Sequence, residues 1–289
     1  MIRSELFELP LLRCLSNWGT GMRYSIGEFA TIAGVSTDTL RLYEKQDIIR
    51  PLRDHSNNYR YYNDLDVRSL LMSRYYRSMQ IPLQDVSELI NSGTSHQVMD
   101  RIDQSKFNLE EQIRKSTLLL NKMKEIQAEL DQIEGRLHKC QIKQLPGRYR
   151  LKQTNQNRLL KVPFLKGVIN EWMELLPFSF FCLRIENWNE APDNDRFEYN
   201  WGVTLTEEDL QNLNVGISDG VEYLPPVRCL SSVIRTSAQD SFSVDSFRFM
   251  LVELADRGHR VVGDITGKLL LNEYIQEDPG SYLEINIPF

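Results

Sequence analysis

Residues 24–62 read YSIGEFATIAGVSTDTLRLYEKQDIIRPLRDHSNNYRYY, and this stretch decides the fold of the N-terminal part of the chain. Ser25, followed three residues later by Glu28, is the capping-box pattern with which a helix begins. After a short turn, Ser36 can cap a second helix over residues 37–46. The pattern predicts a helix-turn-helix, in which the exposed first turn of the second helix enters a DNA major groove.

Three motifs that follow one another in a fixed order resemble the MerR family of transcription regulators. They are RLYE at residues 41–44, IIRPLR at residues 48–53 and YRYY at residues 59–62. Asp47 and Asn58 stand where this family usually has glycine. Asp and Asn tolerate the left-handed backbone better than other non-glycine residues, so both substitutions are compatible with the family.

The resemblance implies a winged helix-turn-helix DNA-binding domain over residues 23–94. It also implies that side chains of the second helix and the wing hold the DNA backbone, which requires cations or hydrogen-bond donors. The predicted DNA-binding residues are Thr37, Thr39, Arg41, Tyr43, Arg53, His55, Tyr59 and Arg60. The two threonines are expected to touch base edges, whereas Tyr61 is expected to pack the wing onto the domain. The implied partners are double-stranded promoter DNA and RNA polymerase, with the protein activating transcription by distorting the promoter.

Length and composition describe an ordinary soluble globular protein of two domains, because the chain has 289 residues, 41% of them hydrophobic and 26% charged. Residues 41–77 hold eight Lys and Arg against five Asp and Glu, whereas residues 164–289 hold nine against 21. This asymmetry indicates an anionic partner for the first part and either a cationic partner or a solvated surface for the second. We expect residues 1–22 to be a flexible N-terminal extension.

The four cysteines are far apart and lack the spacing of metal ligands, so we expect free thiols in a reducing cytoplasm. No metal and no cofactor are predicted. No apolar run is long enough to span a bilayer, so no membrane association is expected.

Residues 99–140 contain no proline and a single glycine, and their apolar side chains repeat with heptad spacing. The seam comprises Leu119, Met123, Ile126, Leu130, Ile133, Leu137 and Cys140. It predicts a coiled-coil helix over residues 95–143, and the resemblance implies an antiparallel homodimer through this helix. The alternative is a long helix that lies on its own C-terminal domain.

Residues 146–289 form the predicted C-terminal domain, which gives the chain an α+β fold. Strands are expected at 149–152, 178–185, 197–205, 227–235 and 282–287, and helices at 164–176 and 244–257. This order resembles a GyrI-like effector-binding domain with an antiparallel sheet. The resemblance is carried by WGV at 201–203, YLP at 223–225 and EINIP at 284–288.

Aromatic side chains and carboxylates in this domain suggest a site for a lipophilic effector. In one version of this hypothesis the effector is a cation, which would contact the aromatic rings and a carboxylate. The predicted ligand-binding residues are Trp172, Glu186, Tyr199, Trp201, Tyr223 and Glu284, with Asp264 as a further candidate carboxylate. The same aromatics could simply form a hydrophobic core. No nucleophile motif or phosphate loop is present, so an enzyme is not expected. A hydrolytic effector domain, or one that contacts a protein partner, remains the alternative.

Overall fold

The computed structural model describes residues 23–56, 58–156, 158–161, 166–188, 197–237, 242–274 and 279–289. The chain divides into two compact units, Met1–Arg114 and Lys115–Phe289, each of which is described by itself. The predicted extension over residues 1–22 lies outside the described residues. The boundary between the units falls within one long helix rather than at a linker.

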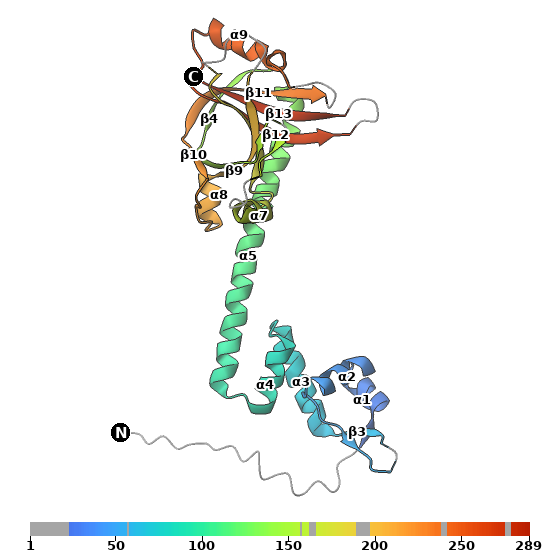
Figure 1. Ribbon diagram of the computed structural model, residues 1–289. Coiled ribbons are helices and arrows are strands. Elements are labelled where there is room, and N and C mark those ends of the chain that lie inside the picture. Colours follow the sequence, from blue (N-terminus) through green and yellow to red (C-terminus); the bar gives the residue numbers. More distant parts are fainter. Residues whose placement is uncertain are drawn as a thin grey trace, which may run out of the picture. The chain divides into compact units, whose positions relative to one another are not determined.

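The N-terminal unit combines short helices (Figure 1) with a small antiparallel sheet. The strand order of this sheet is β1-β3-β2. Its elements are β1 (Tyr24–Ser25), α1 (Ile26–Ala33), α2 (Thr37–Lys45), β2 (Leu52–Arg53), β3 (Arg60–Tyr62), α3 (Asp64–Ser78), α4 (Leu83–Ser92) and the first part of α5 (Ser95–Asp131). The helix-turn-helix and the wing predicted from the sequence are therefore present.

Local chemistry explains why these elements begin and end where they do. The Ser25 side chain accepts from the Glu28 backbone NH while the Glu28 carboxylate accepts from the Ser25 backbone NH, which completes the expected capping box. Gly34 ends α1 with a φ of 62°. Asp47 and Asn58 have φ values of 57° and 59°, as their place in the family pattern predicted.

The core of this unit forms where α1, α2 and α3 meet the wing strands. Phe29 stacks on Tyr62 with 4.7 Å between ring centroids, and both side chains are fully buried. The sequence spacing places Val67, Leu70, Leu71, Tyr75 and Met79 on one inward face of α3; Leu70 is buried as expected, but Leu71 and Tyr75 are exposed. The buried face of α3 follows residues 66, 70, 73 and 76, which is a helical stripe in a different phase.

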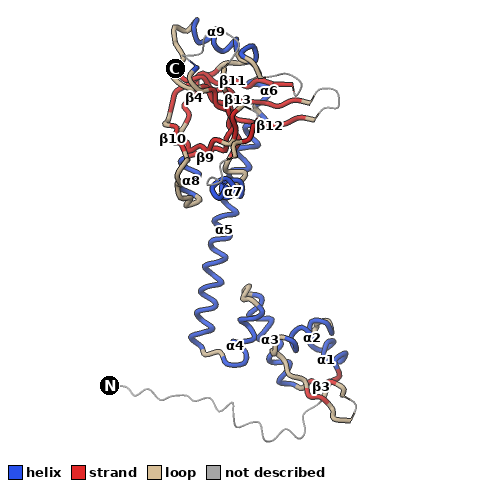
Figure 2. The backbone as a smooth tube through the Cα atoms, viewed as in Figure 1, coloured by secondary structure: helices blue, strands red, loops and turns tan. Residues whose placement is uncertain are grey.

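The C-terminal unit is built on one eight-stranded sheet whose strand pairs are all antiparallel (Figure 2). The strand order is β10-β5-β9-β8-β12-β13-β11-β4. The strands are β4 (Gln141–Leu145), β5 (Arg148–Lys152), β8 (Phe180–Ile185), β9 (Tyr199–Thr206), β10 (Glu222–Leu224), β11 (Val227–Ser237), β12 (Ile265–Glu273) and β13 (Gly280–Pro288). The sequence predicted five of these strands and missed β4, β10 and β12, which are short or contain polar residues at many positions.

The C-terminal unit has further elements besides this sheet. They are α6 (Ile133–Arg136), the hairpin β6 (Thr154–Asn155) and β7 (Arg158–Leu159), α7 (Lys166–Glu174), α8 (Glu207–Asn212), η3 (Val244–Ser246) and α9 (Arg248–Asp256). The start of the helix predicted from Phe164 lies outside the described residues. The helix predicted over residues 244–257 is divided into η3 and α9.

The two faces of the sheet differ in chemistry because side chains alternate along each strand. One face carries Leu183 and Ile285, which belong to the core under η3 and α9. A second core contains Leu151 and Val203 together with Trp172 of α7. The opposite face is polar. It carries Arg148, Arg150, Lys268 and Glu284 and faces the last turns of α5.

The long helix differs from its prediction at its C-terminal end. A continuous helix was expected over residues 95–143, but α5 ends at Asp131 and the short α6 follows. His138 then adopts a φ of 55°, and β4 begins at Gln141.

The later seam residues pack within their own unit. Ile126 and Leu130 are half-buried and line a cavity of that unit, and Ile133 is buried. Leu137 forms a β-bridge with Val233. This arrangement is the alternative that the sequence left open, because a heptad pattern defines an apolar face and not what covers it.

Candidate nucleic-acid interface and ligand cavity

The first turn of α2 is positioned by a cap. The Ser36 hydroxyl accepts from the Thr39 backbone NH at 3.1 Å, which fixes the start of the helix. Thr37 and Thr39 are half-buried there. Arg41 pairs with Asp38 at 2.9 Å, but both side chains are more than half exposed, so this pair is weak and the guanidinium can exchange it for a phosphate.

The wing is attached to α2 through one carboxylate. Glu44 accepts from Arg53 at 3.3 Å and from Arg60 at 2.9 Å, which ties β2 and β3 to the second helix. The Glu44 side chain is only 20% exposed, so the pairs are partly shielded from water. This carboxylate holds both predicted phosphate-binding arginines in place and offsets part of their charge.

The other predicted DNA-binding residues lie in two environments. Tyr59 and His55 are exposed in and beside the loop of the wing, where the Asn58 backbone NH donates to the Asp54 carbonyl. Tyr43 is buried in the core and only 8% exposed, as the helical spacing of Leu40 and Tyr43 predicts. Its predicted contact with the DNA backbone stays a prediction.

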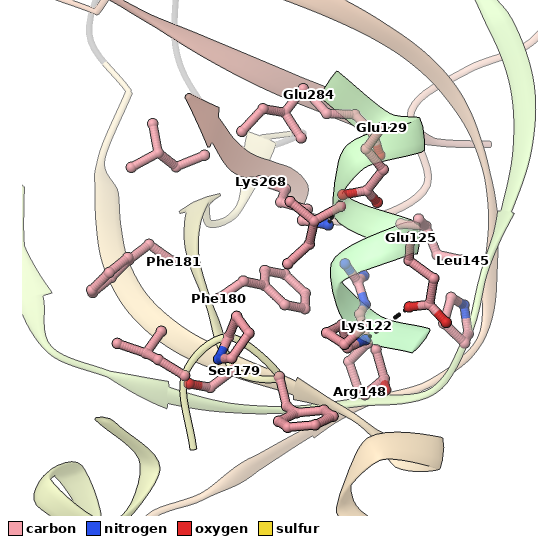
Figure 3. A pocket seen from close by; sticks show the side chains of 18 of the residues that line it. Lys122, Glu125, Glu129, Leu145, Arg148, Ser179, Phe180, Phe181, Lys268 and Glu284 are labelled. Atoms are coloured by element: carbon pink, nitrogen blue, oxygen red, sulfur yellow. Dashed lines mark hydrogen bonds and ion pairs between the residues drawn. The ribbon is translucent and has the colours of Figure 1, made fainter. Parts of the chain in front are cut away.

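A cavity of about 360 Å³ lies between the last turns of α5 and the polar face of the sheet (Figure 3). Figure 3 shows Lys122, Glu125 and Glu129 projecting from α5 on one side and Phe180 of β8 on the other. Its lining combines apolar and charged side chains, namely Lys122, Glu125, Ile126, Glu129, Leu130, Lys143, Leu145, Arg148, Leu176, Phe178, Phe180, Phe181, Lys268, Leu269, Glu284 and Asn286.

Ion pairs connect α5 to this unit around the cavity. Lys122 contacts Asp209 at 2.7 Å and Glu125 at 3.1 Å. Burial alone would lower the pKa of Lys122, but Asp209 and Glu125 together outweigh burial and the pKa is raised. Glu129 accepts from Lys268 of β12, so ion pairs attach the helix to α8 at one level and to the sheet at another.

Glu284, one of the predicted ligand carboxylates, lines the cavity but already has two cationic partners. It is 1% exposed and contacts Arg136 and Lys143 at 2.7 Å each. Burial raises the pKa of Glu284, yet Lys143 and Arg136 outweigh burial and the net pKa lies below its usual range. The carboxylate is therefore ionised and neutralised within the protein.

The six predicted ligand-binding residues do not meet in one site. Trp201 lines a second cavity of about 440 Å³, together with Phe181 and Phe242. Tyr199 packs against Phe197 and Phe242 with ring centroids 6.1 and 5.9 Å apart. Of the six predicted ligand-binding residues, Glu284 is the one that lines the first cavity.

The other predicted residues have structural partners. Trp172 is fully buried in a core cluster. Tyr223 is half-exposed on β10, and Glu186 pairs with Lys152 at 3.3 Å. The further candidate, Asp264, pairs with an arginine of β8.

Sequence reasoning missed Arg148. Its side chain lines the first cavity, and the residue is only 6% exposed. Its Nε is buried without a hydrogen-bond partner, and no ion pair to it occurs among the described residues. The alternation Arg148-Tyr149-Arg150 could have revealed it, because a strand places both arginines on the same face.

Comparison with known proteins assigns the N-terminal unit. Residues 24–93 match the model of the MerR HTH family regulatory protein. These residues form a MerR-type helix-turn-helix domain. The match covers the recognition helix and the wing and ends before α5.

Curated relatives match over the same part of the chain. The HTH-type transcriptional regulator ZntR of Escherichia coli K12 is 34% identical over 68 residues, which is 24% of this chain and 48% of that protein. The HTH-type transcriptional activator TipA of Streptomyces coelicolor is 33% identical over 70 residues, which is 24% of this chain and 28% of that protein. The chain thus spans about half or less of the length of these relatives.

Solved structures show a weaker likeness over more of the chain. One chain of the "EcmrR-DNA complex in EcmrR-RPo" aligns over 92% of this chain and 98% of its own length, at 15% identity and a TM-score of 0.38. The EcmrR C-terminal domain covers 52% of this chain and 95% of its own, at 11% identity and a TM-score of 0.35. At these values the likeness does not establish the fold or ligand of the C-terminal unit.

Among the described residues, no helix combines the length and the apolar character that a bilayer crossing requires. Within the same ranges, no group of three or more His, Cys, Asp or Glu side chains is arranged to hold a metal ion.

Proposed function

We propose that the protein is a DNA-binding transcription regulator whose C-terminal unit responds to a small molecule. The observation that carries the DNA part is the match of residues 24–93 to the MerR family model, with the exposed first turn of α2 and the arginines of the wing on that domain. Such a domain holds phosphates with cations and reads base edges from its second helix. Promoter DNA is therefore the proposed partner.

The protein acts as a homodimer in this proposal, through α5. Large apolar side chains are exposed along this helix, among them Leu109, Ile113, Leu120 and Met123. Their spacings of four, seven and three residues follow one helix face, and a partner helix would cover them. Dimerisation sets the distance between two recognition helices along the DNA.

The small molecule acts through the same helix. The last turns of α5 line the cavity of the C-terminal unit, while its first part belongs to the N-terminal unit, where the Ser105 hydroxyl donates to the Met79 carbonyl. A ligand shifts the protein between states only if it binds one of them more tightly. In this proposal the protein activates transcription by distorting promoter DNA toward the geometry that RNA polymerase needs. Contacts between the protein and the distorted DNA offset the energy of deforming it.

The salt dependence of binding to a duplex tests the DNA part. Arg41→Ala should weaken binding of the full-length protein to any duplex and should flatten the plot of log K against log salt by about 0.9 for each phosphate that a subunit no longer neutralises. Arg260→Ala, which removes an exposed arginine of the C-terminal unit, is the matched control and should leave the slope unchanged. An identical slope for the wild type and Arg41→Ala would refute the phosphate contact.

Selection of bound duplexes from a random pool tests the dimer. We expect inverted repeats whose half-sites have a constant separation, because a two-fold symmetric dimer reads each half-site once. Enrichment of single half-sites without a fixed separation would contradict it.

A further inference from the structure

The cavity under the polar face of the sheet contains a buried cation that has no partner among the described residues. Arg148 is 6% exposed, its Nε makes no hydrogen bond, and none of the described carboxylates pairs with it. Burying an unpaired charge costs several kcal/mol in proteins. The neighbouring Cys229 thiol cannot offset this charge, because burial raises its pKa to about 11 and keeps it neutral.

The other charges around the cavity are matched. Lys122 pairs with Glu125 and Asp209, and Lys268 pairs with a carboxylate of α5. Glu284 has Arg136 and Lys143 as partners. Once these pairs are formed, the lining has one unpaired cation, Arg148, and no unpaired carboxylate among the described residues.

This balance disfavours a cationic ligand. A cationic ligand in the cavity would have to compete with Arg136 and Lys143 for Glu284. The charge of Arg148 would also repel that ligand. An oxyanion would instead supply the partner that Arg148 lacks. The planar guanidinium binds carboxylates in a bidentate geometry, which makes such contacts both strong and directional.

The rest of the lining is apolar and aromatic. Phe178 precedes β8, Phe180 and Phe181 are its first residues, and Leu145, Leu176 and Leu269 add aliphatic surface. The cavity volume of about 360 Å³ lies at the small end of the range typical for ligand sites. A compound that fills it therefore has one apolar body and one charged end.

We propose that this cavity binds a lipophilic organic anion, with its carboxylate on Arg148 and its apolar body against Phe178 and Phe180. The proposal deepens the proposed function, because it names the class of small molecule to which the C-terminal unit responds. It replaces the cationic version that the sequence suggested. Ligand and helix meet directly, since Ile126 and Leu130 of α5 line the same cavity.

Calorimetric titration of the full-length protein with three compounds of one shape tests the proposal. The probes are 4-phenylbutanoate, 4-phenylbutan-1-ol and 4-phenylbutylammonium, which differ in the charge of one end. We expect the carboxylate to bind at least about tenfold more tightly than the alcohol, and the ammonium compound to bind most weakly, because a hydrogen-bonded charge pair contributes about that factor or more.

Arg148→Met should abolish the preference for the carboxylate without changing the affinity of the alcohol. It should also leave the melting temperature of the C-terminal unit unchanged or raise it, because it removes an unpaired buried charge. Arg260→Met, at an exposed arginine, is the matched control and should change neither reading. A variant that melts lower and keeps the preference would show that Arg148 serves the fold and would overturn the proposal.

Two further results would overturn the ligand class. One is no detectable binding of 4-phenylbutanoate up to on the order of 10 mM, which is weaker than the affinity that a buried charge pair supports. The other is tightest binding of the ammonium compound with loss of that binding in Glu284→Gln, which would restore the cationic version. Because no DNA is present, either result leaves the DNA-binding proposal to be judged by its own salt dependence.

Discussion

Replacing Glu284 with glutamine should destabilise the C-terminal unit by about 3 kcal/mol, because it leaves the charges of Arg136 and Lys143 without their carboxylate. Removing one partner of a buried pair costs about 3–5 kcal/mol when the remaining charge stays buried. The Arg136 side chain is 12% exposed and cannot reach water easily, whereas that of Lys143 is 34% exposed and can. The expected cost therefore lies at the low end of that range.

Urea unfolding followed by tryptophan fluorescence measures this cost. The described tryptophans, Trp172, Trp188 and Trp201, all lie in the C-terminal unit, and Trp172 is fully buried. Glu253→Gln is the control, because it breaks an exposed pair with Arg257 at 2.7 Å and should cost about 0.5 kcal/mol.

The pH dependence provides a second reading of the same prediction. The pKa of Glu284 is below its ordinary value of 4.5, so its ion pairs contribute stability above that pH and lose it as the pH falls through the lowered pKa. The difference in unfolding free energy between the wild type and Glu284→Gln should be constant near neutral pH and should shrink below about pH 4.5. A cost close to that of Glu253→Gln, or a difference that does not change with acidity, would refute the reasoning.

Three further predictions concern other parts of the chain. Ser25→Ala should destabilise α1 by about 1 kcal/mol, seen as faster hydrogen exchange of its amides; unchanged exchange would contradict the role of the cap. Glu44→Gln should tighten binding to a duplex and steepen its salt dependence in fluorescence anisotropy, because it releases the two wing arginines; weaker binding would show that their positions matter more than their charge. Gly202→Ala should destabilise the C-terminal unit by about 1–3 kcal/mol in urea unfolding, because the added Cβ would lie 2.5 Å from the Leu151 carbonyl oxygen and 3.1 Å from Arg150; full stability would show that β5 can move away.

The N-terminal unit was readable from the sequence because its signals are local. The capping box at Ser25 and Glu28 and the left-handed residues Asp47 and Asn58 lie next to the turns that they form. The burial of Leu40 and Tyr43 also follows from their helical spacing, whereas Leu71 and Tyr75 of α3 were expected to face inward and are exposed.

The sequence by itself determined the helix-turn-helix, the wing and the antiparallel α+β character of the second half, because caps, turns and alternating side chains act over a few residues. Tertiary structure decided where α5 ends and what covers Ile126 and Leu130, since periodicity records an apolar face without its partner. It also decided the charge of the cavity. Glu284 could be singled out in the sequence. Only the sheet register and the packing of α6 bring Lys143 and Arg136 to it and leave Arg148 unpaired among the described residues, because these contacts join segments far apart in the chain.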